Sequence, residues 1–192
     1  MNSSKATLRI VGGKFRSRRL RVLLRPGLRP TPDRVRETLF NWLGQDLAGL
    51  ACLDLYAGSG ALGFEAASRG AARVVMVEKD RAARAALQRS RAALGAAEVE
   101  IVAGDAAAFL ARGEERFDVV FLDPPFRQNA VPAILGSLGR RLVPRARVYV
   151  ESDAPVVAVP PWIELKRGKA GRVSYQLLQW SGNDQGGVSG NV

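Results

Sequence analysis

The most distinctive candidate chemistry in the sequence is the run Asp123-Pro124-Pro125-Phe126, which follows the apolar stretch 119–122. An amine on a purine or pyrimidine ring is a poor nucleophile because its lone pair is delocalised into the ring. The Asp123 carboxylate and the Pro124 carbonyl can each accept one amine proton, and this favours the reactive form. Two prolines hold that carbonyl in place, and Phe126 offers a face for a flipped or unpaired base. The run therefore favours activation of a nucleobase amine over the alternative, a rigid turn with Phe126 in the core.

A second candidate site is the glycine-rich segment GSGALG at 58–63, which follows the β-rich segment 51–57. Glu78 comes twenty residues after Gly58. Taken literally, this is the dinucleotide-binding fingerprint with its ribose-binding acid. No lysine follows the glycines, so a phosphate-binding loop of the nucleotide triphosphatases is excluded.

Four acids each follow a separate β-rich segment, and they are Asp54, Glu78, Asp105 and Asp123. Open α/β sheets bind their ligands at the carboxyl ends of the strands, so these side chains are expected around one crevice. Four carboxylates would repel a pyrophosphate, whereas they suit a ligand with an ammonium, a sulfonium and hydroxyl groups. The pattern predicts S-adenosylmethionine as the ligand. For any one acid alone, a strand end that faces water remains the simpler interpretation.

The elements that position these residues alternate in type from residue 51 onward. The β-rich segments are 51–57, 73–80, 99–105, 117–125 and 145–152, and helical stretches are expected at 61–69, 80–94, 105–112 and 129–139. This alternation predicts a parallel, doubly wound α/β sheet. The β-rich runs 162–168 and 173–180 are separated by too few residues for a helix, so they predict an antiparallel hairpin that completes a seven-stranded, mostly parallel sheet.

The N-terminal segment combines a predicted hairpin with a concentration of positive charge. Residues 7–23 predict two short strands around Gly12 and Gly13, and a helix is expected next, with Thr31 as N-cap and Pro32 at its first position. Residues 1–36 carry eleven basic side chains and one acid, a net charge of +10, while the whole chain carries +11.

Such a one-ended distribution predicts an arm that binds a polyanion, with nucleic acid favoured because nine of the eleven cations are arginines. A solubilising face or a membrane-surface arm are the alternatives. The candidate RNA-binding residues are Lys14, Arg16, Arg18, Arg19, Arg21 and Arg34. A regular strand would place Arg19 and Arg21 on one face and Arg16 and Arg18 on the other.

Composition narrows the remaining possibilities. The 192 residues suit one domain with a small appendage, and 47% of them are hydrophobic, which is enough for a core. Absence of histidine and the presence of one cysteine, Cys52, exclude an internal disulfide, a zinc finger and a histidine-based triad, and no metal is expected. Cys52 is expected to pack in the first strand of the sheet. No apolar run is long enough for a membrane span or a signal peptide, which predicts a soluble, cytoplasmic protein.

Four runs together resemble the bacterial RsmD family: residues 29–42 (RPTPDRVRETLFNW), 54–63, 123–126 and 149–152 (YVES). The resemblance covers roughly residues 8–180. Members of this family are S-adenosylmethionine-dependent enzymes that methylate N2 of a guanine in 16S ribosomal RNA. The resemblance implies a Rossmann-like class I methyltransferase fold with an N-terminal β-hairpin arm, and a substrate within an assembled or assembling small ribosomal subunit. We expect a monomer.

The resemblance also implies roles for particular residues. The segment from Asp54 to Gly60 would surround the methionine part of the cofactor, Glu78 would hold the ribose hydroxyls, and Asp105 with Ala106 would meet the adenine. The full expected cofactor set is Asp54, Tyr56, Ala57, Gly58, Ser59, Gly60, Glu78, Lys79, Asp105 and Ala106. Residues 123–126 would hold the guanine amine. Tyr56 stands where phenylalanine is common in the family, and either ring fits the same space.

The implied organisation is an RNA-gripping arm (1–30), a catalytic domain (31–180) and a disordered tail (181–192). Three other functions stay open at this point. They are an amine methyltransferase that acts on adenine or cytosine of DNA or another RNA, an oxidoreductase that uses GSGALG as a dinucleotide site, and an RNA-binding assembly factor without activity.

Overall fold

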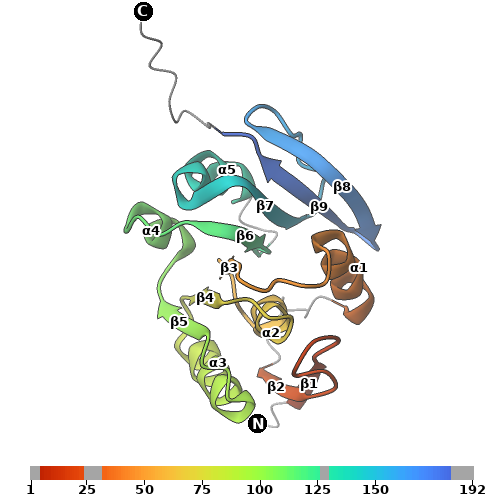
Figure 1. Cartoon of the computed structure of the whole chain (residues 1–192), viewed down its shortest axis with the longest axis vertical. Coiled ribbons are helices and arrows are strands. Elements are labelled where there is room, and N and C mark those ends of the chain that lie inside the picture. The colour runs from red at the N-terminus through yellow and green to blue at the C-terminus, as the bar shows by residue number, and fades with distance from the viewer. Residues whose placement is uncertain (1–4, 24–31, 126–129, 183–192) are drawn as a thin grey trace, which may run out of the picture.

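The computed structural model describes residues 5–23, 32–125 and 130–182. Its centre is a seven-stranded sheet in the order β5-β4-β3-β6-β7-β9-β8, and a separate two-stranded sheet pairs β1 with β2 (Figure 1). The predicted α/β fold with a mostly parallel sheet and a C-terminal antiparallel hairpin is confirmed. No helix in this part of the chain has the length and apolar character needed to cross a membrane.

The parallel strands are β3 (Ala51–Asp54), β4 (Arg73–Glu78), β5 (Val99–Ala103), β6 (Phe117–Leu122) and β7 (Leu142–Ser152). The antiparallel pair β8 (Trp162–Ala170) and β9 (Val173–Trp180) completes the sheet, with β9 beside β7. The chain passes from β3 outward to β4 and β5, and then returns to the other side of β3 as β6. Ligands of open α/β sheets bind at such a reversal of strand order.

Helices cover both faces of the sheet. The core on one face includes α1 (Asp33–Leu43), α2 (Ala61–Ser68) and α3 (Arg81–Leu94). The core on the other face includes α4 (Ala106–Ala111) and α5 (Val131–Leu138), and the short 3-10 helix η2 (Gly139–Arg141) leads into β7. Every residue of α2 is buried. A helix buried all round needs cover on its outer side, and Figure 1 shows α2 with α1, α3 and the β1–β2 hairpin around it.

The first turn of α1 differs from the prediction. The helix begins at Asp33, with Pro32 at the N-cap position and no side-chain cap. Proline was expected one position later, as the first helical residue, and Thr31 lies outside the described residues. Asp33 in the first turn still complements the helix dipole.

The N-terminal strands are β1 (Lys5–Arg9) and β2 (Arg19–Leu23), which pair antiparallel with Arg9 opposite Arg19. Their connection spans residues 10–18 instead of a tight turn at Gly12 and Gly13. The predicted alternation of four arginines along one strand is therefore wrong, because Arg16 and Arg18 precede β2. The cause is a second turn in the connection, where Ser17 has a positive φ of 68° and its N–H donates to the Ile10 carbonyl.

The C-terminal hairpin has a tighter turn than the sequence suggested. β8 continues through Ala170, so only Gly171 and Arg172 connect the strands. Gly171 has a φ of 61°, in the left-handed region that glycine adopts without strain.

Candidate active site

The five parallel strands bring five acids to one edge of the sheet. In the order of the strands, Asp105 follows β5, Glu78 ends β4, Asp54 ends β3, Asp123 follows β6 and Glu151 lies near the end of β7. Carboxyl ends of parallel strands share an edge, so the four acids singled out in the sequence do lie along one side of the molecule. The fifth, Glu151, belongs to the YVES run and was not among the expected site residues.

The segment between β3 and α2 is shaped by two glycines with positive φ, Gly58 (49°) and Gly60 (79°). A Cβ atom at Gly60 would lie 2.6 Å from the Phe64 ring and 2.7 Å from Leu87. The turn is therefore closed to larger residues for both conformational and packing reasons. This segment contains the expected cofactor residues Tyr56, Ala57, Gly58, Ser59 and Gly60.

Glu78 holds that segment from the neighbouring strand. Its Oε2 accepts the Gly58 N–H at 2.8 Å, and its Oε1 accepts the Asp80 N–H at 2.8 Å. The carboxylate thus organises the backbone of two loops at once. A carboxylate can accept further hydrogen bonds, so a ribose hydroxyl remains a chemically reasonable partner for Glu78.

Asp54 is the most deeply buried of the four predicted acids, with 2% of its surface exposed. Its Oδ2 accepts the Gly63 N–H at 3.1 Å, inside the first turn of α2. Burial raises the pKa of Asp54 to about 7, and the nearby Glu78 charge adds to the rise, while hydrogen bonds from Gly63 and Tyr56 oppose it. A cationic ligand beside this group would offset the effect of burial.

Asp123 lies between two other acids. Burial raises its pKa well above the ordinary value, with further contributions from the charges of Glu151 and Asp54. Glu151, which is 5% exposed, accepts a hydrogen bond from the Tyr149 hydroxyl at 2.9 Å. The register pairs Leu122 with Val150, so the next residues along the two strands, Asp123 and Glu151, are neighbours.

The remainder of the predicted motif is only partly described. Pro124 is buried and Pro125 is exposed, while Phe126 lies outside the described residues. At the other end of the edge, Asp105 is exposed and caps α4 by accepting the Ala107 N–H at 2.9 Å, and Ala106 is buried. Lys79 is exposed. Burial raises the pKa of the Tyr56 phenol, and the charge of nearby Asp105 adds to the rise.

A buried glutamate in α2 fastens the N-terminal hairpin to the domain, and no sequence pattern had indicated it. Glu65 is fully buried and accepts the Val11 N–H at 2.9 Å and the Gly12 N–H at 2.8 Å. It also pairs with Arg69 at 3.0 Å and with the fully buried Arg36 at 3.4 Å. Arg36 therefore acts inside the structure, although it contributes to the N-terminal charge excess.

The expected RNA-binding cations fall into two groups. Lys14 pairs with Glu98 at 2.8 Å, and Arg18 donates to the Ala93 carbonyl at 2.7 Å. Arg16, Arg19 and Arg34 are exposed, and their side chains have no hydrogen-bond or ion-pair partner in the described part of the chain. The strand position of Arg21 is described but its side chain is not.

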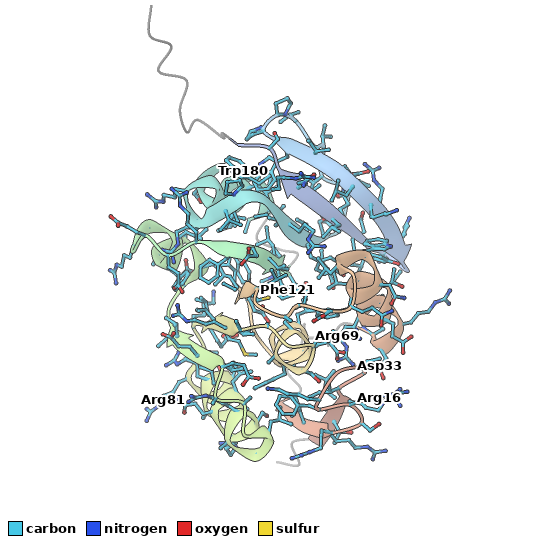
Figure 2. The ribbon with its side chains drawn as sticks, in the orientation of Figure 1. Arg16, Asp33, Arg69, Arg81, Phe121 and Trp180 are labelled. Atoms are coloured by element: carbon cyan, nitrogen blue, oxygen red, sulfur yellow. The ribbon has the colours of Figure 1, made fainter. Side chains whose placement is uncertain are left out.

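The connection between β1 and β2 lies at the far end of α2 from the acid-bearing edge. The Lys14 N–H donates to the Ser68 carbonyl at 2.7 Å and the Phe15 N–H donates to the Ser68 hydroxyl at 2.8 Å. Ser68 is the last residue of α2, and eight residues of α-helix span about 12 Å. In Figure 2, Arg16 accordingly lies on the hairpin, well separated from Phe121, which precedes Asp123 by two residues.

The chemistry of this edge suits a ligand that carries positive charge and hydroxyl groups. The 55–60 segment contacts this edge through the Gly58 N–H and Glu78, and no group of three or more His, Cys, Asp or Glu side chains in the described ranges is arranged to hold a metal ion. Asp54 and Glu78 would face the ligand from β3 and β4, and Asp123 would face a second reactant from β6.

Comparisons with known proteins give a consistent result. A family model described as "Conserved hypothetical protein 95" matches residues 8–179. The curated protein "Ribosomal RNA small subunit methyltransferase D" of Escherichia coli strain K12 is 44% identical over 183 residues, which cover 93% of this chain and 92% of that protein. The protein of the same name from Haemophilus influenzae is 41% identical over 185 residues, covering 92% and 96% of the two chains.

Solved structures agree with the sequence comparison. A candidate methyltransferase of Escherichia coli, yhhF, is 42% identical, covers 93% of this chain and all of its own, and has a TM-score of 0.84. A candidate methylase of Haemophilus influenzae is 38% identical, with a TM-score of 0.78 and coverage of 91% and 98%. These matches extend over nearly the whole chain and include all four runs on which the resemblance was based. The chain belongs to the RsmD family, whose model carries the description "Conserved hypothetical protein 95".

Proposed function

We propose that this protein transfers a methyl group from S-adenosylmethionine to small-subunit ribosomal RNA, at the exocyclic N2 amine of a guanine. The observation that carries the proposal is the position of Asp123, at the carboxyl end of β6 between the ends of β3 and β7. The names of relatives that are 41–44% identical support the substrate class, because they are called ribosomal RNA small subunit methyltransferases.

The residues of the edge fit S-adenosylmethionine better than a nicotinamide dinucleotide. Asp54, Glu78, Asp105 and Asp123 crowd carboxyl groups along this edge, which disfavours a pyrophosphate, and a cationic ligand would lower the raised pKa values of Asp54 and Asp123. The cofactor supplies a methyl group on a positively charged sulfur, so its charge complements these acids. The backbone of the 55–60 segment, shaped by Gly58 and Gly60, would border the methionine part, and Glu78 would accept hydrogen bonds from the ribose hydroxyls.

Asp123 and the Pro124 carbonyl act on the acceptor base. Each accepts one hydrogen bond from the guanine N2 amine, which keeps the nitrogen lone pair directed at the methyl carbon instead of into the ring. The amine nitrogen becomes positive as it gains the methyl group and S-adenosylhomocysteine leaves, and the neighbouring carboxyl groups of Asp123 and Glu151 offset that charge and accept the proton that the nitrogen then loses. Most of the rate gain therefore comes from position and charge arranged before the reaction.

The RNA itself is held by positive charge outside the acidic edge. Arg16, Arg19 and Arg34 are exposed and unengaged within the described residues, so they can bind phosphates. The proposal includes a cytoplasmic, monomeric enzyme that acts on an assembled or assembling small subunit.

The experiment that tests the function is transfer of a tritiated methyl group from S-adenosylmethionine to small ribosomal subunits that lack the modification. Digestion to nucleosides should place the label in N2-methylguanosine. Asp123→Ala, with S-adenosylhomocysteine binding as its folding control, should lose the transfer. Label in a methylated adenosine or cytidine would replace the guanine assignment with the rival amine chemistry, and no label in any RNA would overturn the proposal.

A further inference from the structure

The turn between β8 and β9 lies at the same edge of the sheet as the catalytic acids. Ser152, the last residue of β7, pairs with Ser174 of β9, and Ser174 pairs with Lys169 of β8. The turn residues Gly171 and Arg172 therefore extend just beyond the end of β7. Adjacent strands are about 4.8 Å apart, so Lys169 is three strand spacings, about 14 Å, from the Asp123 position along the edge.

Two cations at this turn are available to a partner, one near the end of β8 and one in the turn itself. Lys169 and Arg172 are exposed, and neither side chain has a hydrogen-bond or ion-pair partner within the described ranges. Arg167, by contrast, is tied to Glu164 on the same strand at 2.8 Å. Asp153, directly after β7, is an exposed acid in this corner, and the two cations outweigh its charge.

The strands that carry the turn pack against the rest of the site. The Tyr175 ring lies 5.4 Å from the Trp42 ring of α1 and 6.4 Å from the Tyr149 ring, whose hydroxyl binds Glu151. Gly168 opposite Tyr175 makes this possible, since a Cβ there would lie 2.3 Å from the ring. Figure 1 shows the β8–β9 turn beside α1.

The β1–β2 hairpin does not supply positive charge at the acidic edge, where RNA phosphates would be repelled. An RNA strand whose base enters beside Asp54, Asp123 and Glu151 brings its phosphates close to carboxylates, and these repel it. The hairpin cations Lys14 and Arg18 are engaged with Glu98 and Ala93, and their connection is a helix length away from this edge. Unengaged cations beside the site would supply the missing attraction.

We propose that the β8–β9 turn is a second RNA-binding surface, on which Lys169 and Arg172 bind phosphates of the nucleotides that flank the methylated guanine. This inference rests on the proposed function. The hairpin then holds a more distant part of the RNA, and the two surfaces together determine how the strand crosses the acidic edge.

The test compares two double variants with equal loss of charge. Lys169→Ala with Arg172→Ala removes the turn cations, and Arg112→Ala with Arg116→Ala removes two exposed cations that precede β6 at the opposite edge of the sheet. Binding of small subunits is measured at several salt concentrations, and S-adenosylhomocysteine affinity is measured by calorimetry. Each lost phosphate contact lowers the slope of log affinity against log salt by about 0.7 to 0.9.

In the turn variant, the slope of log affinity against log salt should be smaller by about 1.4 to 1.8. The KM for the RNA should be higher than in the wild type, and the cofactor affinity should be unchanged. The control variant should keep the wild-type slope. Equal slopes for wild type and the turn variant, with the wild type still active, would overturn the second surface and leave the proposed function intact. A wild-type protein that neither binds nor methylates small subunits would overturn both.

Discussion

Replacing Asp54 with asparagine should make the protein more stable at alkaline pH. The asparagine side chain can still accept the Gly63 N–H, but it cannot carry charge. Burial raises the pKa of Asp54 from its ordinary 3.8 to about 7, and this side chain is 2% exposed, so little screening by water is available. Each unit of pKa shift corresponds to about 1.4 kcal/mol, so an ionised Asp54 destabilises the fold at pH 8 by about 4 kcal/mol.

The stability lost through ionisation of Asp54 depends on pH in a predictable direction. The folded state holds the Asp54 proton more tightly than the unfolded state, so the stability of the wild type falls as pH rises from about 4 to about 7. The gain from Asp54→Asn should be near zero at pH 4 and should reach its full size above pH 7. Asp123 contributes a decrease in the same direction, and this decrease is smaller in the variant because the Asp54 charge no longer raises the pKa of Asp123, so it adds to the gain.

Urea denaturation followed by fluorescence of the three tryptophans, at pH 4, 5.5, 7 and 8, measures this difference. Asp153→Asn, at an exposed position after β7, is the matched control and should change stability by less than about 0.5 kcal/mol throughout. A difference for Asp54→Asn that stays flat with pH, or that is negative at pH 8, would refute the reasoning. The same variant should bind S-adenosylmethionine less tightly, with a smaller loss for S-adenosylhomocysteine, which lacks the sulfonium charge.

Three further substitutions and one pair test other parts of the structure. Glu78→Ala should weaken S-adenosylhomocysteine binding by about 1 to 3 kcal/mol in calorimetry, because hydrogen bonds to buried hydroxyls and to the Gly58 loop are lost; unchanged affinity would remove its ribose role. Asp123→Ala should lower methyl transfer about 100-fold or more in single-turnover assays while the cofactor still binds. Glu65→Ala removes the ion pairs to Arg36, which keeps Asp33, and to Arg69, and it leaves two N–H groups unsatisfied, so it should lower the unfolding free energy by about 3 kcal/mol in urea titrations. Arg16→Ala with Arg19→Ala should reduce the salt slope of RNA binding by about 1.4 to 1.8, and an unaltered slope would make the hairpin a solubilising face.

The positions of the four predicted acids could be inferred from the sequence because they depend on local patterns. β-rich segments that alternate with helices imply parallel strands, and the residues that follow such strands must meet at one edge. Glu151 could have been found by the same rule, since it ends the fifth β-rich segment. The Tyr149 hydroxyl that donates to it lies two residues earlier on the same strand, whereas its effect on Asp123 depends on how β7 pairs with β6, and that pairing leaves no local signal.

The sequence by itself determined the type and order of the elements, the acid-rich edge and the family of this chain, because periodicity, turn residues and motifs are read over short distances. Tertiary structure decided which positively charged side chains remain free to bind RNA. Glu65 binds Val11 across 54 residues of sequence and pairs with Arg36, and Lys14 and Arg18 are engaged by partners far away in the sequence, which no pattern near them predicts. It also brought Lys169 and Arg172 to the acidic edge. Net charge sums over a chain, whereas recognition depends on where packing leaves each charge exposed.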